Sequence, residues 1–230
     1  GYAIQTVASN SLLILAPGET SALGTPLSGG QRVISPTGFD CVSLDHYRRQ
    51  LKQGRLERAE IKAFESVAGR GDYLAADITA AYNSTRYAEL GSEAKVSLVT
   101  RQFLYLRGEG AFVVFDRVET TRAEYTPKFL LHGLSKPRTA SERLLAGTDA
   151  TDGILETSDR VVRIDGERGV LTQRILLPEQ ARTLKIGGPH YAGFVQACGN
   201  LEGVNLAPDV GKGGTGAKPK GLWRVEVEPI

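Results

Sequence analysis

The stretch VSLVTRQFLYLRGEGAFVVFDRVE, Val96 to Glu119, decides the fold class of this chain. Two long apolar runs flank the triplet Gly108-Glu109-Gly110, and glycine at both ends of a short turn supplies the positive φ that a tight hairpin needs. The run Phe112 to Phe115 is apolar at every position, so we expect its strand to lie in the middle of the core. The stretch therefore predicts a long β-hairpin with one central strand.

Four charged residues interrupt this hairpin. They are Arg101, Arg107, Asp116 and Arg117. Because a charge near a core persists only when it is paired, we interpret these residues as a structural network at the edge of the sheet rather than as a binding site.

Further β-type runs, bounded by Gly, Pro, Asn and Asp, recur about every ten to fifteen residues, which is typical of a sandwich or barrel. The expected strands, besides the two of the hairpin, are Ser11–Leu15, Leu56–Val67, Tyr73–Tyr82, Tyr125–Leu134, Arg160–Ile164, Val170–Leu177, Leu184–Ile186 and Leu222–Val227. Only Leu44 to Gln53 has a helical pattern, with Asp45 near its start and Gly54 as a C-cap. The sequence thus predicts an all-β fold: a large antiparallel β-sandwich with at most one or two short helices.

Length and charge limit the function classes. The 230 residues are enough for one large β domain with its own core. A formal charge of +2 falls short of a nucleic-acid binder, and no apolar run reaches the roughly 18 residues of a membrane span. We therefore expect no nucleic-acid partner and no membrane span. The sequence has no methionine and begins at Gly1, which favours a piece of a longer polypeptide.

The remaining motifs give no catalytic pattern. His46, His132 and His190 show no HxH or HExxH spacing, so each is interpreted as a structural histidine. Cys41 and Cys198 fit either two buried thiols or one long-range disulfide. The pattern Asn83-Ser84-Thr85 predicts an exposed loop after the preceding strand.

Several phrases, taken in order, resemble the heparinase II/III-like family of bacterial polysaccharide lyases. They are YAIQTVASNSLLILAPGE (2–19), GDYLAADITAAY (71–82), VTRQFLYLRGEGAFVVFDRVE (99–119), KFLLHG (128–133), GVLTQRILLP (169–178), KIGG (185–188) and GLWRVEVEP (221–229). The resemblance implies an N-terminal α/α toroid followed by a large β-sandwich, with the substrate cleft between them. We therefore expect residues 1–230 to be a single β-sandwich domain that lacks the toroid and the last strand.

One functional position of the family falls within the chain. The family phrase AHNTLL carries a histidine that helps to bind a structural zinc ion in some members, and the matching stretch here is Ala8 to Leu13. Ser9 replaces that histidine, and a hydroxyl is a poor zinc ligand beside imidazole, so we expect no metal or other cofactor in this chain. Asn10 matches the family asparagine, and we expect its side chain to face the substrate cleft.

The resemblance also implies a function. The family eliminates uronate-containing polysaccharide with a tyrosine and histidines that lie upstream of the position matching Gly1. We therefore expect a chain that is inactive alone, that forms one wall of the cleft beside the toroid, and that belongs to a periplasmic or secreted bacterial enzyme acting on acidic polysaccharide. Arg48 and Arg49, with Lys52, form the densest basic cluster and are candidate substrate contacts, although a solvated helix face also explains them.

Two other functions stay open. One is a non-catalytic carbohydrate-binding or scaffolding sandwich within a larger secreted or surface protein. The other is a sandwich that shares only the architecture of the family and binds an unrelated protein partner.

Overall fold

A computed structural model describes residues 6–19, 29–32, 43–53, 56, 59–83, 87–88, 91–196, 203–205 and 223–230. The chain divides into two compact units. The first contains the described residues of Gly1–Pro17, Ser28–Gly30 and Thr126–Ile230, and the second those of Gly18–Leu27 and Gln31–Tyr125. The predicted single domain over 1–230 stays a prediction, and each unit is described by itself. Cys41, Cys198 and Gly54 lie outside the described residues.

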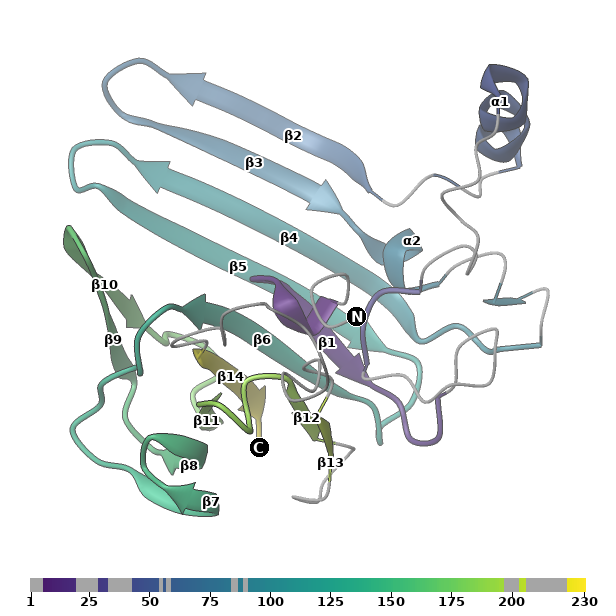
Figure 1. The fold of residues 1–230 in the computed structure, drawn as a ribbon. Helices are drawn as coiled ribbons and strands as arrows, with labels where there is room; N and C mark the ends of the chain where they lie inside the picture. Colours follow the sequence, from purple (N-terminus) through teal and green to yellow (C-terminus); the bar gives the residue numbers. More distant parts are fainter. Residues whose placement is uncertain are drawn as a thin grey trace. The chain divides into compact units, whose positions relative to one another are not determined.

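The first unit is built on a six-stranded antiparallel sheet (Figure 1). Its strands, in spatial order, are β1 (Leu12–Leu15), β6 (Thr126–Gly133), β14 (Trp223–Pro229), β11 (Ala181–Gly187), β8 (Asp152–Thr157) and β7 (Arg143–Asp149). Two short hairpins accompany the sheet: β9 (Val161–Gly166) with β10 (Gly169–Arg174), and β12 (Phe194–Gln196) with β13 (Gly203–Asn205).

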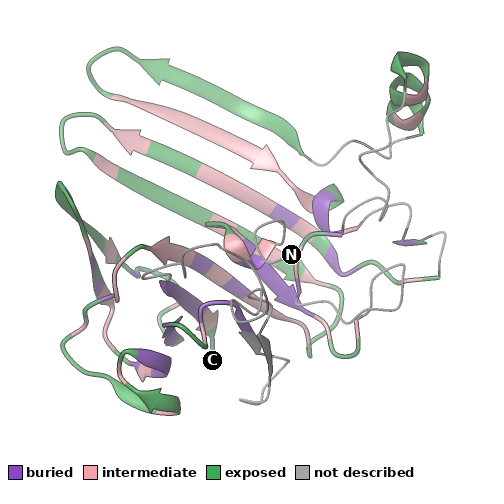
Figure 2. Cartoon of the chain, in the orientation of Figure 1, coloured by how far each residue is buried: buried purple, intermediate pink, exposed green. Residues whose placement is uncertain are grey.

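Both faces of this sheet carry a core. On one face, Val225 and Val227 of β14 pack against Val162 and Ile164 of β9, together with Ile175. On the other face the two clusters are Ile154, Leu184, Ile186 and Phe194, and Val7, Leu13 and Leu130. Val7 belongs to the 3₁₀ helix η2 (Thr6–Ala8). The buried residues are therefore concentrated on the strands of this sheet (Figure 2).

The second unit is a four-stranded antiparallel meander. Its strands are β2 (Glu60–Val67), β3 (Gly71–Asp77), β4 (Val96–Leu106) and β5 (Ala111–Thr120). The hairpin predicted from Val96 to Glu119 is confirmed, with Leu106 opposite Ala111 and a positive φ of 59° at Gly110. Together the sheets confirm the all-β fold class, and the helices bounded within the described residues, α1 and α2, are short.

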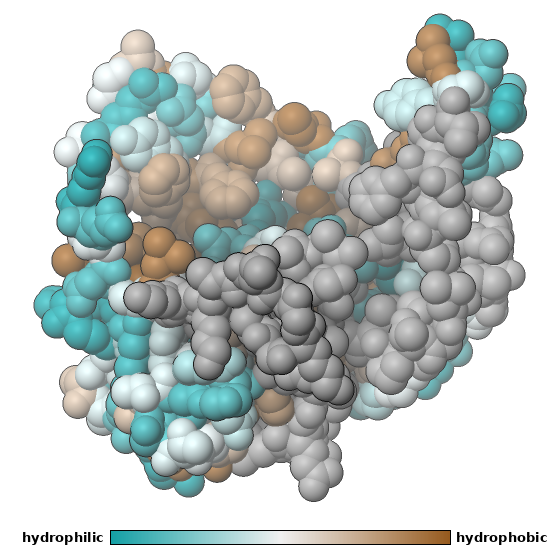
Figure 3. All heavy atoms as spheres, viewed as in Figure 1, coloured by the Kyte–Doolittle hydropathy of each residue, from teal (hydrophilic) through white to brown (hydrophobic). Residues whose placement is uncertain are grey.

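The predicted central position of Phe112 to Phe115 is wrong. Among the described strands β5 pairs only with β4, and the Phe112 side chain is 68% exposed. Apolar residues on both faces of a strand indicate what could be buried, but burial also needs a layer over each face. Figure 3 accordingly shows apolar side chains at the surface where this sheet lies.

The predicted charge network is confirmed, with partners from further strands. Arg101 binds Asp116 through two hydrogen bonds of 2.6 and 2.8 Å, and both side chains are nearly buried. Arg107 binds Asp72 of β3 rather than a residue of its own hairpin. Arg117 pairs with Glu119 on the same strand.

The helix predicted over Leu44 to Gln53 is confirmed as α1 (Leu44–Lys52). Its N-cap is Ser43, whose hydroxyl oxygen accepts a hydrogen bond of 3.1 Å from the His46 amide. The strand predicted over Tyr73 to Tyr82 ends early, because Asp77 accepts the amide of Thr79 and starts the short helix α2 (Thr79–Tyr82). A local side-chain bond thus overrides the apolar pattern.

Of the loop predicted to be exposed after Tyr82, only Asn83 is described, and Ser84 and Thr85 lie outside the described residues. The Asn83 side-chain oxygen accepts from the backbone amides of Lys95 (2.8 Å) and Val96 (3.2 Å), and its amide nitrogen donates to the Val96 carbonyl (2.5 Å). The residue is half-buried and holds α2 to the start of β4.

Candidate functional site

Charged residues of the first unit gather on one face of the six-stranded sheet, on its central strands. Antiparallel pairing places Arg224 of β14 directly opposite His132 of β6, and side chains alternate along each strand. Glu226 lies two residues on from Arg224, and Lys128 lies four residues before His132, so all four side chains share this face. The register alone therefore assembles the cluster.

Ion pairs neutralise the buried part of this cluster. Glu226 accepts from Arg224 Nε at 2.8 Å and from Lys128 Nζ at 3.1 Å, and all three side chains are almost fully buried. Burial raises the pKa of Glu226, but the charges of Arg224 and Lys128 lower it by a larger amount. The pKa of Glu226 therefore lies below its usual range. Burial lowers the pKa of Lys128, but Glu226 and Glu228 raise it above its usual value. The cluster stays ionised at neutral pH.

The row of charges continues across the sheet towards solvent. Lys128 also contacts Glu228 at 3.0 Å, and Arg182 of β11 bridges Glu228 (3.2 Å) and Glu156 of β8 (2.8 Å). Arg143 of β7 then pairs with Glu156, and its side chain is exposed. Each cation in this row has a carboxylate partner, so these side chains neutralise one another rather than presenting free charge to a ligand.

Asn10 and His132 meet at the edge of this cluster. The Asn10 side-chain oxygen accepts the backbone amide of His132 at 2.7 Å and lies 3.1 Å from its Nδ1. His132 Nε2 lies 2.8 Å from the Val7 carbonyl oxygen, to which it donates. Burial, with the neighbouring Arg224 charge, lowers the pKa of His132 to about 4. The imidazole is therefore neutral at pH 7.

This arrangement can position a segment but is poorly suited to proton transfer at neutral pH. Both ring nitrogens of His132 lie against Asn10 and Val7, and a base with a pKa near 4 accepts protons weakly at pH 7. What the contacts do is fasten the turn before β1 onto β6. Arg224 adds hydrogen bonds to the carbonyls of Ala192 (3.2 Å) and Phe194, which hold a second segment over the same face.

The structure does not bring all the predicted site residues together. Asn10 is exposed and lies in the first unit, where it is held by His132. Arg48 and Arg49 lie on the exposed helix α1 of the second unit, where Arg48 approaches Asp45 at 3.6 Å. Ser9 is exposed beside Asn10. Within the described parts of the chain no cluster of three or more His, Cys, Asp or Glu side chains could hold a metal ion.

Sequence reasoning missed the contact of Asn10 with His132, and the position of His132 opposite Arg224. A signal was present, because the three residues lie in three of the phrases that resemble the lyase family. Strand pairing between β6 and β14 was needed to connect them, and pairing over such a sequence separation cannot be derived from local patterns.

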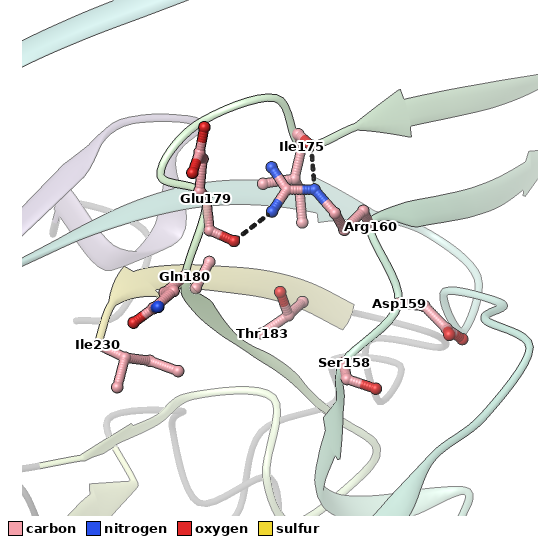
Figure 4. A pocket seen from close by; sticks show the side chains of 9 residues that line it. Ser158, Asp159, Arg160, Ile175, Glu179, Gln180, Thr183 and Ile230 are labelled. Atoms are coloured by element: carbon pink, nitrogen blue, oxygen red, sulfur yellow. Dashed lines mark hydrogen bonds between the residues drawn. The ribbon is translucent and has the colours of Figure 1, made fainter.

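The first unit also contains a pocket of about 310 Å³, lined by residues that include Ser158, Asp159, Gln180 and Thr183 (Figure 4). Arg160 forms one wall and donates hydrogen bonds to the carbonyls of Ile175 (3.0 Å) and Glu179 (2.7 Å). Its guanidinium also donates to the Leu176 carbonyl. Arg160 thus holds the loop after β10 and is not directed at a ligand.

The chain matches no protein-family model, no curated protein and no solved structure. In the part of the chain that is described, none of the helices has the length and apolar character needed to cross a membrane.

Proposed function

We propose that this chain is the β-sandwich portion of a heparinase II/III-like polysaccharide lyase, which eliminates uronate-containing polysaccharide. In this proposal the chain forms one wall of the substrate cleft, and the toroid of the same protein supplies the catalytic tyrosine and histidines. The parent enzyme is periplasmic or secreted in a bacterium, and this chain contributes no catalytic group of its own.

The observation that carries the proposal is the convergence of three of the resembling phrases in space. Asn10, His132 and Arg224 come from the first, fourth and last of those phrases, and they meet at one place on the sheet. Phrases that were matched separately along the sequence thus belong to one packed structure. A fold shared with the family would place these phrases in one sheet, so their convergence supports the proposal.

The chemistry assigns this chain a binding role. Elimination removes the proton α to a uronate carboxylate and expels the glycosidic oxygen, so it needs a cation beside the carboxylate as well as a base and an acid. Arg48, Arg49 and Lys52 on α1 can supply exposed positive charge. In this proposal these three side chains of the second unit bind the carboxylates of the polysaccharide.

The test is a lyase assay on the complete protein encoded by the gene. We expect a rise in absorbance from unsaturated uronate when alginate, hyaluronate or heparin is added, and no rise with the 230-residue chain alone. A complete protein that lacks a helical upstream region, or that eliminates none of these substrates, contradicts the proposal.

A second candidate function is non-catalytic carbohydrate binding, and the aromatic surface of the four-stranded sheet favours it. Phe64 of β2 and Phe103 of β4 share one face with Tyr105 and Phe112, whose rings stack at 4.5 Å. Figure 3 shows apolar surface over this sheet. Binding of polysaccharide by the complete protein without elimination would support this function instead of the first.

A further inference from the structure

Arginines gather on the outer face of the β9–β10 hairpin in the first unit. The backbones of Arg138 and of Arg163 in β9 form a β-bridge. The Arg138 amide donates to the Arg163 carbonyl at 2.7 Å, and the Arg163 amide donates to the Arg138 carbonyl at 2.9 Å. Arg163 is in turn opposite Thr172 of β10, and Arg174 lies two residues further along that strand. Directly opposite residues of antiparallel strands share a face, so the three arginines and Thr172 point the same way.

The opposite face of this hairpin fixes the direction of these side chains. Val162 and Ile164 alternate with Arg163 and are buried in the core against β14. The arginines must therefore point away from the core. Arg163 and Arg174 are exposed, and the side chain of Arg138 is 59% exposed. We name the surface formed by Arg138, Arg163, Thr172 and Arg174 the arginine face.

The arginine face has fewer anions than cations. Asp165, on the same face, accepts one hydrogen bond of 2.7 Å from Arg138. No carboxylate of the described residues forms an ion pair with Arg163 or Arg174. Elsewhere the sheets pair their arginines, as Arg182 pairs with Glu156 and Glu228.

Repulsion between these arginines lowers the free energy of unfolding of the hairpin, and a purely structural role does not explain why they lie together. Like charges on neighbouring positions of adjacent strands destabilise a sheet. Directly opposite residues of a hydrogen-bonded pair have Cα atoms about 5.5 Å apart, and diagonal neighbours about 7–8 Å. Three exposed arginines on neighbouring positions of adjacent strands suit a ligand that repeats its anionic groups along a chain. The planar guanidinium binds carboxylate or sulfate through two parallel hydrogen bonds.

We propose that the arginine face binds acidic polysaccharide, with Arg163 and Arg174 contacting successive carboxylate or sulfate groups and the Thr172 hydroxyl bonding between them. The class of ligand rests on the proposed function, whereas the binding surface rests on the geometry of the hairpin. Single-stranded nucleic acid is the less suitable polyanion, because it binds through stacking on aromatic rings as well as through charge. The described neighbours on this face are Val161, Asp165 and Val170, which offer no ring.

The test measures binding of the 230-residue chain to alginate, in which every sugar ring carries a carboxylate, at low ionic strength. The variant is Arg163→Gln with Arg174→Gln. We expect binding to weaken by about three- to tenfold, because charge pairs that stay exposed to solvent contribute only modestly to the free energy of binding. The affinity of the unmodified chain should fall as salt is added, and neutral dextran should not bind.

The matched control is Arg107→Gln with Arg117→Gln, which removes the same charge from exposed positions of the second unit. It should bind alginate as the unmodified chain does. Equal weakening in both double variants would show a general charge effect and overturn the proposal. Failure of the unmodified chain to bind alginate, or equally tight binding of single-stranded DNA, would also overturn it.

The lyase assay on the complete protein is independent of this result. Elimination by the complete protein together with unchanged alginate binding by the Arg163 and Arg174 variant would refute the arginine face alone. Loss of binding in that variant, together with no elimination by the complete protein, would refute the lyase and leave the binding surface.

Discussion

At the scale of single residues, His132 connects charge and stability. Its pKa is about 4 in the folded chain, below the ordinary value of 6.5, because the ring is buried beside Arg224. Between these two values the unfolded chain binds a proton that the folded chain does not. The contribution of the His132 ring to the free energy of unfolding is therefore complete above pH 6.5. It is lost as the pH falls towards 4.

Replacing His132 by Gln should remove this pH dependence. We expect the unmodified chain to lose up to about 3 kcal/mol of unfolding free energy from this group between pH 7 and pH 4, and the His132→Gln variant to lose correspondingly less. Urea denaturation at a series of pH values measures the difference. Asn10→Ala keeps the imidazole, so it should retain the steep dependence. Parallel curves for His132→Gln and the unmodified chain would contradict the assignment.

Residue types alone predicted some positions and misled at others. The resemblance to the lyase family singled out Asn10, but its partner His132 lies on a strand far along the chain. Asn83 looked like a residue of an exposed loop because its three-residue pattern is that of a glycan acceptor. Its amide instead bonds to the backbone of Lys95 and Val96, and only the folded geometry reveals this use.

At the scale of elements, long runs with clear turns were predictable and glycine-rich strands were not. The β4–β5 hairpin combines a strong apolar pattern with a glycine turn, so local signals agree with the fold. Strands β7 and β8 were missed because Gly147 and Gly153 resemble loop residues. In the sheet, these glycines allow close backbone approach: a Cβ on Gly147 would overlap the carbonyl oxygen of Asp152.

This packing makes Gly147 sensitive to substitution by any residue that has a side chain. Its φ of 117° and the adjacent Asp152 backbone leave no room for a side chain. We expect Gly147→Ala to lower the free energy of unfolding by about 2 kcal/mol or more. Gly108 has a turn position with open space around it, and Gly108→Ala should change stability by less than about 1 kcal/mol. Thermal unfolding of the two variants tests this, and equal effects would refute the role of Gly147.

At the scale of the whole molecule, the all-β class followed from the spacing of strands, but the division into two units did not. The core of the first unit brings Val162 and Ile164 together with Val225 and Val227, so it joins strands that are distant in sequence. The arginine face was hidden for the same reason. Arg138 and Arg163 become neighbours only through a bridge between a loop and β9, and no local pattern encodes that pairing.

Two compact units, each with its own buried residues, should respond separately to variants. His132→Gln alters the first unit, at acid pH. Asn83→Ala alters the second, where it leaves the amides of Lys95 and Val96 without their acceptor and should cost about 2–3 kcal/mol.

Hydrogen exchange followed by mass spectrometry should show faster exchange after Asn83→Ala in β2–β5 and unchanged exchange in β6, β11 and β14. Thr85→Ala removes the same three-residue pattern but keeps the Asn83 amide, so its exchange should match that of the unmodified chain. Uniform acceleration of exchange in all strands after Asn83→Ala would mean that the chain unfolds as one unit.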